Sequence, residues 1–286
     1  MQDEPRATAG SVWCRRLAMF AVGLILAGAV FHRLFGMPTP VALNLFALGL
    51  VLAVTATVSG VFGLFRIWRT GMPGTASALF GLIVSGLILC WPLSLLPRLN
   101  ALPNINDVTT DTARPPRFVE LARQRPKGAN PARYPGAAVA KLQSAFYREI
   151  QPLFINRAAP EAFELATLAL RRLRMVIVHE VPVGSEVRTE GLIEAYDRTL
   201  ALGFYDDVAV RVTAIGRSSR IDVRSASRFG RHDLGRNARR IRDILNEIVA
   251  RVDATIPGQQ TRKSKKPDAE DDDEEDKPTR RRRKRR

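Results

Sequence analysis

The chain has 286 residues, of which 46% are hydrophobic and 25% charged, and its formal net charge is +16 at pH 7. Only part of this charge belongs to the C-terminal segment, because Gly258–Arg286 holds 12 Lys and Arg against 8 Asp and Glu. A single basic face for nucleic acid is therefore not indicated. The two cysteines, Cys14 and Cys90, have no metal-ligand spacing, so we expect no zinc site, no disulfide framework, no other metal and no cofactor.

Three apolar segments in the first hundred residues predict membrane helices over about 17–35, 41–65 and 76–96. The second and third contain no charged residue, and a bilayer core needs roughly 20 apolar residues in a helix. The first is less uniform, since Arg15 and Arg16 precede it and the small residues Ala27–Ala29 lie within it after an apolar stretch, as in a cleaved signal peptide. For this first segment we favour a retained membrane helix over a cleaved signal peptide.

The arginines beside these segments predict an orientation. One side of the predicted bundle carries five of them, whereas the other short loop carries only Arg33. Because cytoplasmic loops are enriched in Lys and Arg, the N-terminus should be cytoplasmic and the C-terminal part periplasmic, in a multi-pass protein of the inner membrane. The basic end RRRRKRR leaves a cytoplasmic domain as the alternative. The five arginines are Arg6, Arg15, Arg16, Arg66 and Arg69.

We divide the chain into a membrane anchor (1–98), a soluble α+β domain (99–256) and a disordered charged tail (257–286). The domain should begin with an ordered but irregular stretch over 99–137. Short returns between the strands indicate antiparallel pairing. The predicted elements are helices at Ala138–Ile150, from Pro160 and at Leu234–Val252, and strands at Met175–Val181, Leu192–Thr199, Leu200–Phe204, Val208–Val212 and Ile221–Val223, with a turn at Gly216–Arg220.

The junction between the last strand and the last helix, DVRSASRFGRHDLGRNARRI at 222–241, is the strongest candidate site. Asp233 is placed to cap the final helix. A helix N-terminus with hydroxyls and arginines beside it can bind an anion. Alternatively, the arginines pair with Asp206, Asp207 and Asp222 in a structural network, or the cluster is catalytic.

Catalysis has little support in the pattern. Asp206 and Asp207 are neighbours in a predicted strand, so their side chains should point to opposite faces and should not act together. His232, beside Asp233, is a weak candidate for proton transfer. The sequence contains no GxSxG, HExxH, Walker or GxGxxG motif.

The stretches NINDVTTDT, PPRF, IEAYDRTLALGFYDDVAVRV and the 222–241 junction resemble the bacterial and plastid family of domains of unknown function numbered fourteen ninety-nine. The resemblance covers roughly residues 100–250 and implies a compact domain, alone or fused to membrane helices, without an established activity. The matching motif positions, with two flanking arginines, are our candidate ligand-binding residues: Asn106, Asp107, Asp206, Asp207, Arg224, Ser225, Ser227, Arg228, Asp233, Asn237 and Arg240.

Three functions follow as hypotheses. The first is a non-enzymatic domain that binds an anionic or amphiphilic partner at the junction, such as a lipid headgroup or an envelope protein. The second is an envelope hydrolase or transferase, with Asp207 or Asp233 as base and the arginines holding an anion. The third is binding of an anionic membrane or nucleic acid by the polybasic tail. Of these partners, nucleic acid is the least expected.

Overall fold

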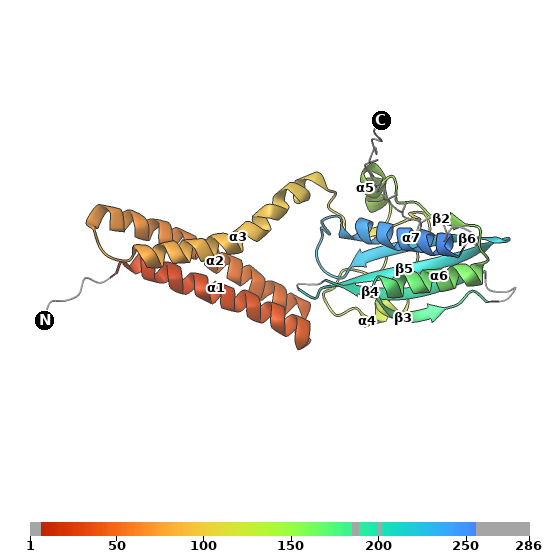
Figure 1. Ribbon diagram of the computed structural model, residues 1–286, viewed down its shortest axis with the longest axis horizontal. Coiled ribbons are helices and arrows are strands. Elements are labelled where there is room, and N and C mark those ends of the chain that lie inside the picture. The colour runs from red at the N-terminus through yellow and green to blue at the C-terminus, as the bar shows by residue number, and fades with distance from the viewer. Residues whose placement is uncertain (1–6, 185–188, 200–201, 256–286) are drawn as a thin grey trace, which may run out of the picture.

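The computed structural model describes residues 7–184, 189–199 and 202–255. The predicted tail (257–286) and Arg6 lie outside the described residues. Three long helices form one end of the molecule, and a sheet covered by helices forms the other (Figure 1). The predicted α+β class is confirmed.

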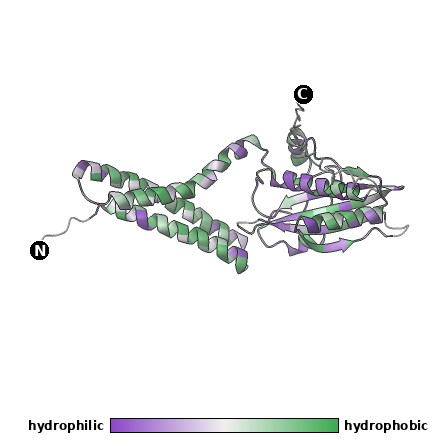
Figure 2. Cartoon of the chain, in the orientation of Figure 1, coloured by the Kyte–Doolittle hydropathy of each residue, from purple (hydrophilic) through white to green (hydrophobic). Residues whose placement is uncertain are grey.

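The three N-terminal helices are α1 (Ala9–Leu34), α2 (Thr39–Thr70) and α3 (Thr75–Ala101). Each is long and apolar enough to cross a membrane, and Figure 2 shows them as the most hydrophobic part of the chain. They extend beyond the three predicted segments. The end of α2 is set by Gly71, whose φ of 67° lies in the left-handed region that terminates many helices.

Small residues allow these helices to approach closely. A Cβ added to Gly63 would lie 2.8 Å from the backbone N of Ser11, and one added to Gly10 would lie 2.8 Å from the carbonyl O of Ser59. Such contacts between small residues are the usual means of packing helices in lipid. The buried residues of α3 all lie in its first half, the last being Ser85. Beyond this point α3 separates from α1 and α2 and runs towards the domain (Figure 1).

The domain is built on an antiparallel sheet with the strand order β1-β6-β5-β4-β3, in which β2 also pairs with β6. The short strands β1 and β2 therefore share one edge of β6, at Arg224–Ala226 and Ser219–Ile221. The strands are β1 (Asp107–Thr109), β2 (Leu153–Ile155), β3 (Val176–Val181), β4 (Glu190–Arg198), β5 (Tyr205–Ile215) and β6 (Ser218–Ser227).

One face of the sheet is covered by α6 (Ala159–Arg172) and α7 (Arg236–Ala254), which lie side by side (Figure 1). The alternation in β5 places Val208, Val210 and Val212 in this core, as the sequence predicted. They pack with the apolar stripe of α7, and each large aliphatic side chain so buried contributes about 1.5–3 kcal/mol.

The opposite face is covered by the segment between β1 and α5 (Ala137–Phe146), which contains the short helix α4 (Glu120–Gln124). Its apolar cluster is small and consists of Phe118, Leu121, Ala209 and Ala226. Charged side chains fill much of the remaining space. Glu194, for example, is fully buried and accepts three backbone N–H bonds at the start of α4.

Several predicted elements need correction. Residues 202–204 are not a strand but part of a turn, in which the N–H of Gly203 donates to the carbonyl of Thr199; residues 200–201 are outside the described part. The final helix begins at Arg236 because Leu234 and Gly235 have positive φ angles. Other differences are that α5 ends at Phe146, that β5 and β6 extend beyond the predicted strands at both ends, that β2 was not predicted, and that α4 and β1 lie within the stretch expected to be irregular.

Candidate functional site

The candidate residues lie at one end of the sheet but on its two faces. In the paired strands β5 and β6, Asp206 and Ser225 point towards α7, whereas Asp207 and Arg224 point to the other face. The expectation that the side chains of Asp206 and Asp207 point to opposite faces is confirmed. The structure therefore divides the predicted cluster into two separate networks.

The network below α7 is centred on Arg240, whose side chain is buried. Its guanidinium donates to Asp197 and Asp206, each at 2.7 Å, and to Ser225 and Asn237. Burial disfavours the charged form, but the two carboxylates outweigh this and raise the pKa of Arg240. Asn237 in turn donates to Ser227 and to the carbonyl of Asn106. These bonds fix the first turn of α7 on the sheet.

Asp233 accepts N–H groups at the start of α7, as predicted, although the N-cap residue itself is Gly235, two positions later. Its carboxylate oxygens accept the N–H groups of Gly235 at 2.8 Å and Asn237 at 3.0 Å, and burial raises its pKa. His232 has a structural role beside it, since Nδ1 accepts the N–H of Leu234 at 2.9 Å and Nε2 lies 3.2 Å from the carbonyl O of Leu102. Asp233 thus occupies the position that an anionic ligand would take at this helix end.

On the other face, Arg224 forms a bidentate ion pair with Asp107, with N–O distances of 2.9 and 2.6 Å. Its remaining donors reach the carbonyls of Pro116 and Ala132, and the guanidinium lies over the rings of Phe118 and Tyr134. Only 2% of Arg224 is exposed, so this arginine is not free to bind a ligand. Despite Arg224, burial raises the pKa of Asp107.

Asp207 holds two more arginines on this face. It accepts from Arg125 at 2.8 Å and from Arg228 at 2.7 Å, and burial raises its pKa. Asp222 likewise pairs with Arg211 and Arg220. Of the junction arginines, Arg240 therefore pairs with Asp206 and Arg228 with Asp207, as the structural alternative predicted, whereas the partners of Asp222 come from outside the junction. Arg224, Arg228 and Arg240 are not the open anion contacts that we also considered.

The two carboxylates proposed as catalytic bases do not converge. Asp207 faces its two arginines on one side of the sheet, whereas Asp233 faces the backbone of α7 on the other. The hydrolase or transferase hypothesis required these groups to meet in one cleft. Their positions give it no support.

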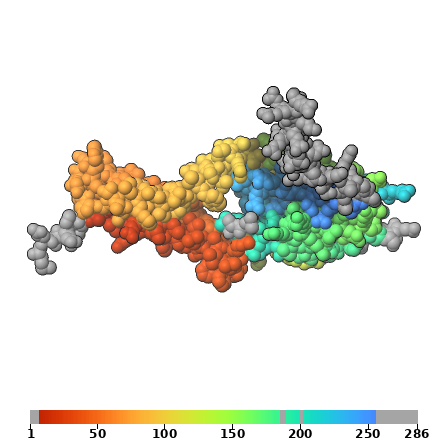
Figure 3. All heavy atoms as spheres, in the orientation of Figure 1, coloured from red at the N-terminus to blue at the C-terminus, as the bar shows by residue number. Residues whose placement is uncertain are grey.

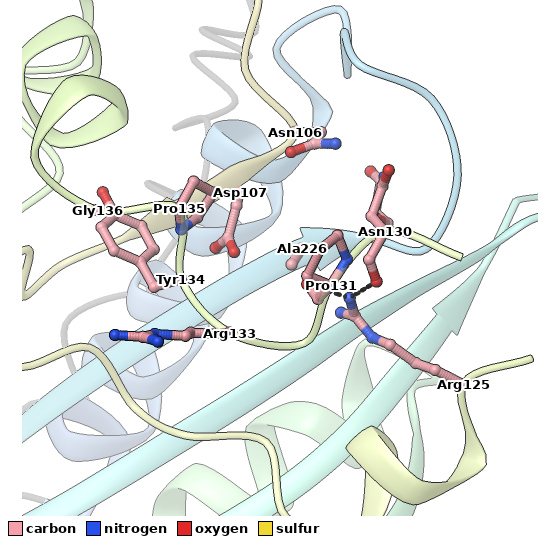
Figure 4. A pocket seen from close by; sticks show the side chains of 11 residues that line it. Asn106, Asp107, Arg125, Asn130, Pro131, Arg133, Tyr134, Pro135, Gly136 and Ala226 are labelled. Atoms are coloured by element: carbon pink, nitrogen blue, oxygen red, sulfur yellow. Dashed lines mark hydrogen bonds between the residues drawn. The ribbon is translucent and has the colours of Figure 1, made fainter. Parts of the chain in front are cut away.

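One hollow does bring some candidate residues together, and Figure 4 shows it at close range. It has a volume of about 440 Å³ and is lined by Asn106, Asp107 and Ser227. A larger hollow of about 940 Å³ lies next to it, and the two share Arg133 and Tyr134.

A second region of interest lies where the domain meets α3, and sequence reasoning missed it. Here the end of α3 approaches the start of α7, and an opening separates α3 from α1 (Figure 3). Two adjoining hollows of about 460 and 350 Å³ share Arg98, Leu234 and Arg239. We call this region the interface cleft. The sequence signal was an arginine in the last turn of α3, together with arginines spaced by three residues at the start of α7.

The arginines of the interface cleft are more open than those inside the domain. Arg98 and Arg239 are exposed, and neither forms an ion pair with any residue in the described part of the chain. Arg236 is 44% exposed at its side chain and lies 3.9 Å from Asp206. Apolar side chains, including Trp91 and Leu95 of α3, line the same cleft.

A family model described as "Protein of unknown function (DUF1499)" matches residues 107–248. The match begins with β1 and ends within α7, so it includes every strand of the sheet, all of α6 and most of α7. The domain at 107–248 belongs to the DUF1499 family. This confirms the resemblance seen in the sequence, and α1–α3 precede the DUF1499 domain. No curated protein matches the chain.

Proposed function

We propose that this protein is a multi-pass protein of the cytoplasmic membrane whose DUF1499 domain lies on the outer side and binds an anionic amphiphile in the interface cleft. The observation that carries the proposal is the pair of exposed arginines, Arg98 and Arg239, which form no ion pair within the described residues and lie beside apolar residues at the end of a candidate membrane span. A phospholipid with an anionic headgroup has the matching chemistry.

The cleft separates charge from apolar surface along α3. Arg98 lies in the last turn of this helix, Leu95 lies about one turn earlier and Trp91 about two turns earlier. Tryptophan is enriched at the boundary between lipid and water, where its ring contacts both. A headgroup phosphate between Arg98 and Arg239 would leave its acyl chains beside Trp91. The separation of α3 from α1 and α2 gives such chains access from the bilayer.

The charge balance of the cleft favours an anion. Four arginines line its larger hollow, against Asp197 and Asp243. Within the buried network Arg240 pairs with both Asp197 and Asp206, and Arg236 also lies 3.9 Å from Asp206. Four arginines thus face three carboxylates, and the excess positive charge belongs to Arg98 and Arg239, which form no ion pair in the described part of the chain.

The orientation rests on the arginines at the two ends of the helices. Arg66 and Arg69 lie near the end of α2 that faces away from the domain (Figure 1). Arg33, the exception in the arginine count, has a structural reason to lie at the domain end. It donates to the carbonyl of Thr199 at 2.9 Å, and Arg198 donates to the carbonyl of Arg33 at 2.7 Å.

Fluorescence quenching by brominated lipids tests the proposal. The chain has three tryptophans, so the W13F/W68F variant reports on Trp91 alone. In nanodiscs of neutral phosphatidylcholine, brominated phosphatidylglycerol should quench Trp91 more strongly than the same fraction of brominated phosphatidylcholine. Adding R98A/R239A should remove this preference, whereas the matched removal of two exposed arginines elsewhere, R217A/R231A, should keep it. Equal quenching by both lipids in the parent would contradict the proposal.

A further inference from the structure

We infer a second binding site, on the face of the sheet opposite α7, for a small anion that carries an apolar or aromatic body. The site is the hollow of about 940 Å³ between residues 112–118 and 132–140, which we call the arginine–alanine hollow. Its volume falls in the usual range for small-molecule sites. It is separate from the interface cleft, and the two share no lining residue.

The walls of this hollow are apolar and mostly small. Phe118, whose exposure is 7%, is the largest wholly apolar side chain among the lining residues. The other apolar lining residues are Ala113, Pro115, Ala122, Ala132, Ala137 and Ala140. Short side chains on three segments leave the open volume, because none of them reaches across the space. Such a surface suits a flat apolar group.

The charged side chains that line the arginine–alanine hollow are all positive. Arg117, Arg133 and Arg224 line the hollow, and no Asp or Glu does. Arg224 is fully engaged with Asp107 and two carbonyls. Arg117 and Arg133 are exposed, and in the part of the chain that the structure describes neither forms an ion pair.

The buried layer beneath the hollow does not compensate these two arginines. Its three guanidinium groups are matched by three carboxylates, and each carboxylate is already bonded to an arginine or to backbone N–H groups. The groups concerned are Arg125, Arg224 and Arg228 with Asp107, Asp207 and Glu194. The positive charge of Arg117 and Arg133 is thus left for a partner from solution.

The base of the hollow is held by contacts of the Arg224 guanidinium with two aromatic rings. The Arg224 guanidinium lies 4.5 Å from the ring centre of Phe118 and 5.6 Å from that of Tyr134. Figure 4 shows Arg133 and Tyr134 on the side of Asp107 away from Arg125, where the two hollows meet. A ligand in the hollow would place its body against Phe118 and its anionic group between Arg117 and Arg133.

Calorimetric titration of the full-length protein in phosphatidylcholine nanodiscs tests this site, with empty nanodiscs subtracted. The probes are 2-naphthoate, its neutral counterpart 2-naphthol, and inorganic phosphate. 2-Naphthoate should bind at least about tenfold more tightly than either of the others, because only it offers both the charge and the apolar body. Equal binding of 2-naphthol would overturn the role of the arginines, and equal binding of phosphate would overturn the role of the apolar walls.

Two variants locate the binding. R117A/R133A removes only exposed side chains and should weaken 2-naphthoate at least about tenfold, while R217A/R231A should not change it. Ala137→Trp keeps both arginines but fills the hollow, so it should also abolish binding. Each variant must melt at the temperature of the parent. Parental affinity in both R117A/R133A and Ala137→Trp would overturn the site, as would no 2-naphthoate binding beyond that of empty nanodiscs.

Discussion

Arg224 and Asp107 are 117 positions apart in the sequence, yet they form a bidentate ion pair in which both side chains are almost fully buried. Removing one partner would leave an uncompensated charge inside the domain. We expect Arg224→Ala to lower the free energy of unfolding by about 3–5 kcal/mol. A clear fall in melting temperature would support a structural role. An unchanged melting temperature would instead favour Arg224 as a ligand contact.

A double-mutant cycle separates the pair from its surroundings. Asp107→Leu and Arg224→Met should each destabilise the domain strongly, because each strands one buried charge. The double variant should be much less unstable than the sum of the two, since apolar replacement of a whole buried pair is often neutral. Additive losses in thermal unfolding would show that the two residues do not act as a pair.

Asp111 gives a pH dependence with a defined sign. Its partial burial opposes ionisation, but the N–H of Arg114 and the guanidiniums of Arg220 and Arg211 outweigh this and lower its pKa. Its stabilising effect should be complete above the unfolded-state pKa of about 3.9 and should disappear as the pH falls through the lower folded-state pKa. The difference in melting temperature between the parent and Asp111→Asn should be constant from pH 7 to about pH 5 and then shrink. A difference that stays constant down to pH 3 would contradict the assignment.

Asp233 should act as a helix cap. Asp233→Ala removes the acceptor for the N–H groups of Gly235 and Asn237, and loss of a cap costs about 0.5–2 kcal/mol. Asp233→Asn and Asp233→Ser retain an acceptor and should recover part of the loss. Hydrogen exchange at the first turn of α7 measures the effect locally. Equal protection of that turn in Asp233→Ala and the parent would contradict it.

The orientation can be checked with single cysteines in a C14A/C90A background. Cysteine at position 231, in the domain, should react with a membrane-impermeant maleimide in spheroplasts. Cysteine at position 69, at the far end of α2, should react only after the membrane is opened. The reverse pattern would place the DUF1499 domain in the cytoplasm.

The polybasic tail lies outside the described residues, and its role stays a prediction. The proposal assigns lipid binding to Arg98 and Arg239 of the interface cleft, so truncation after Pro257 should leave the quenching of Trp91 by brominated phosphatidylglycerol unchanged. If quenching falls with the truncation and becomes independent of Arg98 and Arg239, the tail is the main contact with anionic lipid.

The sequence by itself determined the candidate spans and much of the α+β domain. A membrane helix is recognised from its own apolar residues, and the alternating valines of β5 or the apolar stripe of α7 are likewise local patterns. The Asp233 cap was also predictable, because a capping carboxylate binds the helix that directly follows it.

Only the tertiary structure decided which charged groups are free. β1 and β2 have three residues each, too few to show a pattern, and they exist through pairing with β6. The Asp107–Arg224 pair depends on that same pairing, and the interface cleft depends on α3 ending beside α7. An arginine looks the same in the sequence whether a distant carboxylate neutralises it or solvent surrounds it. Long-range strand pairing and helix packing make this difference, and no local pattern contains it.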